Sequence, residues 1–526
     1  METFTAAERA ALAPYFTELD GPVFALVNLP EVVKGALFAR YSRSAKSLRR
    51  LFLDEFLERA EPAGPAPGSI GTARADRLYE RVFSEYGDDS VAQLGGVHLA
   101  CEGASNILTK VLEWGRLMAY LEQSTRYVPY TDRPDGRWKY HVPAELDGHP
   151  LRERYVAVLD RAFETYARWI DPMREYWTRR LPRAPADSDA TYRMTIRAKA
   201  LDSLRGLLPA ATRSNVGVFG TGQGYEALLL RMQAHPLAEV RDYAGLMLVE
   251  LRKVIPAFLT RLERPERGGV WSAYLAETVR ATTEVAERLL GHIEPEPRPE
   301  VMLTDFDPDG EVKVVAAALY AVSRLPDDQL LAVVRKLGPE ERRRVLEAYV
   351  GRRENRRHKP GRAFERTVYR FDVLGDYGAF RDLQRHRLLT LEWQPLSPRH
   401  GYATPEELVD AGALPDWTRV MDESAALHDA LAAAAPAVAP YAVAMAYRVR
   451  FYMELNAREA MHMIELRTAP QGHPAYRRIC QAMHRLIAEQ AGHRALAAAM
   501  CHADHSGGEG GRRDAERAAE RRRLGS

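Results

Sequence analysis

The chain has 526 residues, and its 74 basic side chains nearly balance 72 acidic ones, which leaves a net charge of +2. This length is too great for one hydrophobic core and suits two domains, while the balanced charge argues against a nucleic-acid-binding protein. The sequence contains no apolar run of 18 residues and no basic-then-apolar start, so we expect neither a membrane span nor a secretory signal. Three scattered cysteines, Cys101, Cys480 and Cys501, predict no disulfide framework and a cytoplasmic location.

The first half of the chain opens with one helical and one strand-like pattern. Residues 32–39 form an apolar stretch that predicts a helix, and residues 97–102 alternate in the manner of a strand. The strand continues through Gly103 and Ala104 into a second helix, for which Ser105 is the expected N-cap.

A polar loop follows this helix. It contains the run Glu122-Gln123-Ser124-Thr125-Arg126-Tyr127. The guanidinium group of Arg126 suits a phosphate, and Glu122 and Ser124 place further polar groups at short range. The loop is therefore a candidate for binding a phosphate-bearing molecule.

The stretch of residues 217–224 is rich in glycine and invites a dinucleotide-binding interpretation. Its spacing, Gly220-x-Gly222-x-Gly224, does not fit G-x-G-x-x-G, because position 225 is tyrosine. We expect a turn or a close helix contact here instead.

Two proline- and charge-rich segments, residues 264–269 and 294–299, bracket a helical connector in the middle of the chain. The predicted organisation is a first domain of residues 1–265, a connector of residues 266–300, a second domain of residues 301–505 and a flexible tail of residues 506–526. His502 and His505 beside Cys501 have no matching ligand pair elsewhere, so no metal site is predicted.

The second half repeats the strand-to-helix pattern and ends it with a basic cluster. Residues 367–373 read as a strand that leads through Gly375 and Asp376 into a short helix over residues 377–384. Arg385, His386 and Arg387 follow directly. Two guanidinium groups beside an imidazole suit phosphates and an electron-rich ring, although a solvated helix end is the simpler alternative.

An amphipathic helix over residues 456–467 presents a second set of polar groups. Asn456 and Arg467 are eleven residues apart and share one face, while Arg458 and His462 are i,i+4 neighbours. Landmarks of the two halves recur in the same order, which indicates a duplicated unit. For example, Leu230-Arg231 with Arg241 ten residues on repeats Leu466-Arg467 with Arg477.

These motifs together resemble the flavin-dependent thymidylate synthases, whose signature is Arg-His-Arg, seven residues and a Ser, with a later Asn-x-Arg helix ending in Leu-Arg. The first half keeps Arg116 and, after the seven-residue gap, Ser124, but it lacks the Arg-His pair. The second half keeps Arg-His-Arg but has Pro395 at the Ser position. The chain thus resembles a tandem, diverged member of that family in which the two copies have lost complementary pieces.

The resemblance implies an α/β (α+β) fold with two similar domains of the thymidylate-synthase-complementing type, each a mixed sheet flanked by many helices. It implies an FAD-dependent methyltransferase that converts dUMP to dTMP, with methylenetetrahydrofolate and NADPH as co-substrates. No cysteine lies in the motifs, which agrees with a hydride from reduced flavin rather than a cysteine nucleophile. The protein would be a homodimer of four fold units that binds a small nucleotide but no nucleic acid or membrane.

The resemblance also assigns residues to roles. Catalysis falls to Arg385, His386 and Arg387. Flavin contacts fall to these three residues and to Ser90, Asn456, Arg458 and His462. Nucleotide contacts fall to Glu122, Ser124, Arg126, Tyr127 and Arg467. In the second copy Arg362 takes the position of Ser90, where it either meets a cofactor phosphate or pairs with Glu365.

Complementary losses leave three interpretations open. In the first, one composite site joins Glu122, Ser124 and Arg126 of the first copy to Arg385, Arg387 and Arg467 of the second. In the second, the chain is a catalytically inactive flavin- or nucleotide-binding scaffold or sensor. In the third, it is a flavoenzyme that acts on another pyrimidine nucleotide.

Overall fold

The computed structural model describes residues 3–41, 44, 46–57, 93–507 and 511–524, and these fall into two compact units. Unit 1 comprises residues 1–102, 111–122 and 215–293, and unit 2 comprises residues 103–110, 123–214 and 294–526. The units differ from the expected boundaries because residues 123–214 of the first half join the second half. The long helices of this segment, α6 (Leu151–Arg180) and α7 (Asp189–Leu204), find their packing partners there.

Unit 1 is built on a three-stranded sheet with the order β1-β3-β2. Its strands are β1 (Gly96–Ser105), β2 (Met118–Glu122) and β3 (Arg213–Thr221). β2 and β3 run antiparallel, with Met118 opposite Gly220. Buried and exposed residues alternate along β3, as expected of a strand with one face on the core.

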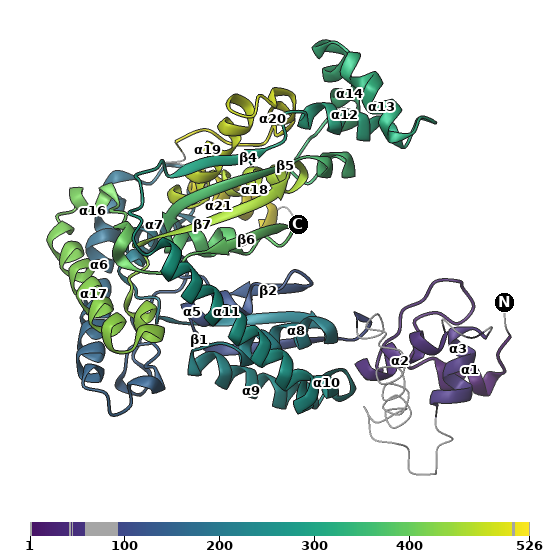
Figure 1. Ribbon diagram of the computed structural model, residues 1–526, viewed down its shortest axis with the longest axis horizontal. Helices are drawn as coiled ribbons and strands as arrows, with labels where there is room; N and C mark the ends of the chain where they lie inside the picture. Colours follow the sequence, from purple (N-terminus) through teal and green to yellow (C-terminus); the bar gives the residue numbers. More distant parts are fainter. Residues whose placement is uncertain (1–2, 42–43, 45, 58–92, 508–510, 525–526) are drawn as a thin grey trace. The chain divides into compact units, whose positions relative to one another are not determined.

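The helices of unit 1 precede and follow this sheet (Figure 1). They are α1 (Ala6–Leu12), α2 (Glu31–Tyr41), α3 (Leu48–Leu51), α8 (Gly222–Gln233), α9 (Ala238–Arg252), α10 (Thr260–Glu263) and α11 (Val270–Leu290), while the residues of α5 (Asn106–Leu112) are divided between the two units. The expected helix over residues 32–39 lies in α2, and the expected connector helix is α11.

The glycine-rich stretch of unit 1 is a close helix contact, as expected. It forms the end of β3 and the start of α8, with Thr221 as the N-cap. A β-carbon at Gly222 would lie 2.6 Å from the Phe258 ring. The glycine therefore lets α8 begin directly against an aromatic side chain.

Unit 2 contains a four-stranded sheet with the order β4-β5-β7-β6. The strands are β4 (Val301–Phe306), β5 (Val368–Asp376), β6 (Leu389–Trp393) and β7 (Arg448–Asn456). A mixed sheet was expected, but all three strand pairings are antiparallel. The physical reason is visible in the alternating burial of β5 and β7, which is typical of antiparallel strands covered on one face.

Helices α15, α18 and α19 pack directly on the strands of this sheet, and Figure 1 shows α18 and α19 beside it. Besides α6 and α7, the α-helices of unit 2 are α12 (Gly310–Tyr320), α13 (Asp327–Lys336), α14 (Pro339–Val350), α15 (Tyr377–Gln384), α16 (Glu406–Asp410), α17 (Leu414–Ala434), α18 (Ala457–Arg467), α19 (Pro474–Glu489), α20 (Arg494–Ala499) and α21 (Gly511–Leu524). α6 packs along α17 and against α7. Within the described part of the chain, no helix has both the length and the apolar character needed to cross a membrane.

Four strands pass directly into helices, and each junction carries a polar N-cap. The capping side chains are Ser105, Thr221, Asp376 and Asn456. Each accepts a backbone N–H from the first turn, which satisfies a donor that the helix leaves open. This recurring junction agrees with two similar domains and fixes the start of α15 and α18, the helices that carry the basic motifs.

The expected flexible tail is in part an ordered helix, α21. Its residue Arg512 is 4% exposed, and the helix packs on α7. The composition of residues 511–524, rich in Arg and Glu, suggested a solvated segment. Ion pairs with acidic residues at both ends of α7, which the tail sequence alone could not reveal, hold the helix in place.

Candidate functional site

A buried ion pair in unit 2 joins the polar loop of the first half to helix α7. Arg126 donates through Nε and Nη2 to the two carboxylate oxygens of Asp202, each at 2.7 Å. Its Nη1 donates to the Tyr476 hydroxyl at 2.9 Å. Burial alone would raise the pKa of Asp202, but the adjacent Arg126 charge outweighs it and holds this pKa well below its usual range.

A second guanidinium group, from the other half of the sequence, lies over the same tyrosine. The guanidinium carbon of Arg467, in the last turn of α18, is 5.5 Å from the centroid of the Tyr476 ring, and that of Arg126 is 6.0 Å from it. The two groups are therefore within the length of one nucleoside monophosphate of each other. A phosphate ester between them could meet donors from both halves of the chain.

Asp382, on α15, forms ion pairs with the surrounding arginines. Its Oδ1 accepts from Arg385 Nη2 at 2.5 Å and from Arg467 Nη1 at 3.4 Å, and Arg205 Nη1 lies 3.6 Å from its Oδ2. Burial opposes ionisation, yet the nearby guanidinium charges hold the pKa of Asp382 well below its usual range. The anion that neutralises these arginines in the described chain is thus a protein carboxylate.

His386 is the most enclosed member of the basic cluster. Its Nε2 accepts from Arg467 Nε at 3.0 Å, so its Nδ1 carries the proton and donates to Glu459 Oε1 at 2.9 Å. Burial lowers the pKa of His386 to about 4, so the imidazole is neutral at pH 7. Burial opposes the ionisation of Glu459, but hydrogen bonds from His386 and His462 lower its pKa to about 2.

The same three side chains come close enough to hold a metal ion. Potential ligand atoms of His386, Glu459 and His462 lie within 4.8 Å of one another. For His386 Nδ1 to bind a metal, its proton would have to move to Nε2, where Arg467 already donates. The hydrogen bonds therefore favour a hydrogen-bonded chain of Glu459, His386 and Arg467 over a metal site.

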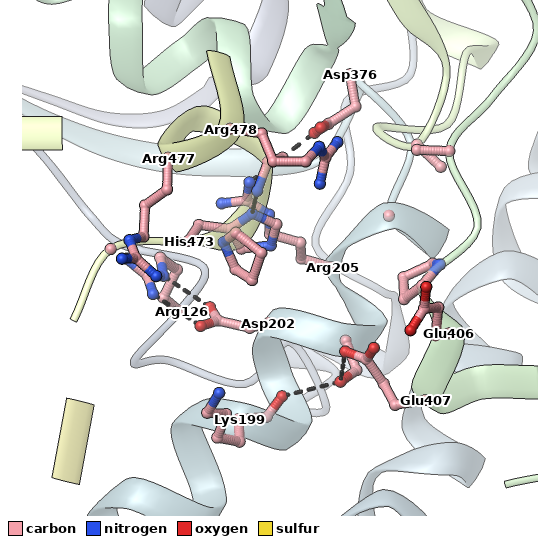
Figure 2. A pocket seen from close by; sticks show the side chains of 18 of the residues that line it. Arg126, Lys199, Asp202, Arg205, Asp376, Glu406, Glu407, His473, Arg477 and Arg478 are labelled. Carbon is pink, nitrogen blue, oxygen red and sulfur yellow. Dashed lines mark hydrogen bonds and ion pairs between the residues drawn. The ribbon is translucent and has the colours of Figure 1, made fainter. Parts of the chain in front are cut away.

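A cavity of about 600 Å³ lies beside the Arg126–Asp202 pair, within unit 2. Figure 2 shows this pair at one side of the cavity and the carboxylates of Glu406 and Glu407 at another. Other charged residues that line it are Lys199, Arg205, Asp376, Arg448, Arg477, Arg478 and Arg512. The volume is in the range of small-molecule sites, and cations outnumber carboxylates on its walls.

Several buried donors on residues that line this cavity have no hydrogen-bond acceptor among the described residues. They are Nη2 of Arg205, Nε and Nη2 of Arg512, and Nε1 of Trp417. These three residues are at most 4% exposed. Since buried donors without acceptors are costly, the walls are suited to a ligand rich in acceptor oxygens.

The sequence profile of the family described as Thymidylate synthase complementing protein matches residues 36–257 and 302–492. The chain belongs to this family. The match in two segments agrees with a tandem duplication. A protein of Chlamydia pneumoniae named UPF0159 protein is 38% identical over 492 residues, which cover 92% of this chain and 93% of that protein. A UPF0159 protein of Chlamydia muridarum is 39% identical over 484 residues, covering 90% and 91%, and one of Thermoplasma acidophilum is 29% identical over 483 residues, covering 86% and 92%.

The nucleotide-binding residues implied by the family are brought together only in part. Arg126 and Arg467 meet at Tyr476, as described above. Ser124 Oγ accepts the Arg126 backbone N–H at 3.2 Å and so shapes the loop. Tyr127 is 54% exposed, and Glu122 is the buried last residue of β2 in unit 1.

The described residues among those that the family implies for flavin binding do not line the cavity. Ser90 lies outside the described residues. Asn456 caps α18 through the N–H of Glu459, and Arg458 Nε donates to the Pro360 carbonyl at 2.9 Å. Arg362 is 87% exposed and pairs with Glu365 at 3.0 Å, which supports the ion-pair alternative for this position.

Among these residues, only the accessible side chains fit a flavin. The side chains of Arg385, Arg458 and His462 are about one-third exposed, and Arg387 is exposed, so cations are accessible there. His386 does not fit the assigned flavin contact, because its ring is buried and both of its nitrogens are bonded within the chain. The described residues at these positions thus offer a basic surface but no enclosed flavin cradle.

Sequence reasoning missed four residues of the site: Asp202, Arg205, Tyr476 and Arg512. Asp202 and Arg205 come from the end of α7, among buried positions such as Leu201 and Leu204. Charged residues at buried positions of an apolar helix face were an available signal. For Tyr476 and Arg512 no comparable local signal exists.

Proposed function

We propose that the chain binds a pyrimidine nucleoside monophosphate at a composite site made by both halves, and that it converts dUMP to dTMP by reductive methylation. The observation that carries this proposal is that Arg126 and Arg467, from different copies, lie over one Tyr476 ring. Methylenetetrahydrofolate would give the carbon and NADPH the reducing equivalents. Family membership supports the reaction class.

Binding of the phosphate would exchange protein carboxylates for phosphate oxygens. In the described chain Arg126 is bonded by Asp202 and Arg467 by Asp382. A phosphate dianion offers more acceptor oxygens than one carboxylate and could share both guanidinium groups. The Tyr476 hydroxyl, which already accepts from Arg126, would keep that side chain oriented.

FAD, when bound, would supply the hydride. Its phosphates would meet the accessible cations Arg385, Arg387 and Arg458, with His462 beside them. Because these groups lie at a surface, the flavin site would be completed by a second copy of the chain in a homodimer. Neutral His386 would hold Arg467 in position through Nε2 rather than contact the cofactor.

A second candidate is a nucleotide-binding protein without catalysis. The specific observation that favours it is the enclosure of His386, whose ring nitrogens bond to Glu459 and Arg467 and which is 8% exposed. A third candidate keeps the chemistry but takes another pyrimidine nucleotide.

Titration calorimetry with dUMP, followed by an assay for dTMP with methylenetetrahydrofolate, FAD and NADPH, separates these candidates. Replacing Arg467 by alanine should weaken dUMP binding about 10- to 100-fold, the effect of one charge-assisted contact of roughly 1.5–3 kcal/mol. Arg343→Ala, which changes an exposed arginine on α14, should leave binding unchanged.

Each outcome identifies one candidate. Binding with turnover supports the synthase, and binding without turnover and without flavin absorbance supports the non-catalytic protein. Binding of dCMP or dTMP in preference to dUMP supports the third candidate. No binding of any pyrimidine nucleotide by the wild-type chain, or full binding by Arg467→Ala, refutes the composite site.

A further inference from the structure

The C-terminal helix α21 places one arginine inside the cavity of unit 2. Arg512 is the second residue of this helix and is 4% exposed. Its Nη1 donates to Asp202 Oδ2 at 3.3 Å, and its guanidinium carbon is 4.9 Å from the centroid of the Tyr127 ring. Nε and Nη2 have no acceptor among the described residues.

The rest of α21 is held on α7 by contacts away from the cavity. Arg517 Nε donates to Asp187 Oδ1 at 2.5 Å, and Arg513 lies 4.0 Å from the same carboxylate. The Thr191 hydroxyl donates to Glu520 at 2.9 Å. The helix is thus anchored at the start of α7, while Arg512 reaches the end of α7, where Asp202 lies.

The charges at this end of the cavity do not balance. Asp202 carries one negative charge and is bonded by two guanidinium groups, those of Arg126 and Arg512. The closest carboxylates to Arg205, which lines the same cavity, are at 3.6 and 3.9 Å. Buried cations in excess call for a further anion, and Arg512, which lines this cavity, has two nitrogens without an acceptor among the described residues.

We propose that Arg512 is a phosphate-binding residue delivered by the C-terminal helix, and that α21 completes the site for a phosphate monoester dianion. The proposal rests on the proposed nucleotide-binding function and adds to it a residue outside both copies of the duplicated unit. Arg126, bonded twice to Asp202, sets the position of that carboxylate. Arg512, bonded once, keeps donors for the ligand.

The test uses the full chain, with dUMP and deoxyuridine as probes in titration calorimetry. Arg512→Gln should weaken dUMP binding about 10- to 100-fold, because one charge-assisted contact is lost. Arg512→Lys should recover part of that loss, since a charge without the fork geometry remains. Deoxyuridine, which lacks the phosphate, should bind wild type and Arg512→Gln equally.

Two further variants control for the fold of α21. Arg521→Ala changes an exposed arginine of the same helix and should bind dUMP as wild type does. Arg517→Ala removes an anchor of α21 without touching the cavity, so it should weaken dUMP binding and leave deoxyuridine unaffected.

The outcomes separate this proposal from the proposed function. If wild type binds neither dUMP nor inorganic phosphate, both fail. If wild type binds dUMP and Arg512→Gln binds it equally well, the composite site stands and the role of Arg512 is refuted. Tighter binding by Arg512→Gln would also refute it, because α21 would then block the site rather than complete it.

Discussion

Removal of Arg126 and removal of Asp202 should lower the free energy of unfolding by different amounts. Both side chains are about nine-tenths buried, so removal of one partner from a buried ion pair should cost roughly 3–5 kcal/mol of unfolding free energy. Arg126→Ala leaves Asp202 with Arg512 at 3.3 Å, whereas Asp202→Ala leaves two guanidinium groups without their carboxylate. Asp202→Ala should therefore be the more destabilising change.

Chemical denaturation of the single variants and of the double variant measures this couple. The double variant should lose less free energy than the two single variants combined, by at least about 2 kcal/mol, because each single change leaves a buried charge. Arg343→Ala, in an exposed pair with Glu340, should cost less than about 1 kcal/mol. Additive effects, or a larger loss in Arg126→Ala than in Asp202→Ala, would contradict the described geometry.

Three further predictions concern other buried groups. The pKa of His386 is lowered to about 4 in the folded chain, so the unfolded chain binds an additional proton between pH 6.5 and 4. Over this range the free energy of unfolding should therefore fall by about 3 kcal/mol more in wild type than in His386→Asn, as measured by denaturation curves. Gly222→Ala should destabilise unit 1 by roughly 1–3 kcal/mol because its β-carbon would meet the Phe258 ring, and an unchanged melting temperature would count against this contact. Arg353→Ala should lower the free energy of unfolding by roughly 3–5 kcal/mol, since Arg353 and Glu465 are joined by two hydrogen bonds and their side chains are only 1% exposed. A loss below about 1 kcal/mol in the same measurement would refute this prediction.

Local patterns in the sequence predicted the strand-to-helix junctions and the motif-bearing helices well. The helix expected over residues 377–384 is α15, and Ser105 and Asp376 are N-caps as expected. These features depend on a few neighbouring residues, because capping and alternation are local. The sequence therefore placed Arg385–Arg387 and the Asn456 helix correctly along the chain.

Features that depend on distant partners could not be predicted in this way. The family resemblance assigned His386 to a flavin contact, but the structure shows a neutral ring whose two nitrogens bond to Glu459 and Arg467. Likewise, nothing near Arg512 indicates that Asp202 is its partner. Burial and pairing are set by packing among remote segments, so residue type alone does not determine charge state or exposure.

The contact between α21 and α7 constrains the order in which the chain can mature during its synthesis. Arg512 and Asp202 are 310 residues apart in sequence. At roughly 5–20 residues per second, a ribosome needs about 15–60 s to make the intervening chain. During that interval α6 and α7 have been made but lack α17 and α21, so their apolar face awaits its partners. Expression of the first half alone should therefore yield an aggregation-prone fragment, even though the duplication in the sequence suggests a self-contained domain.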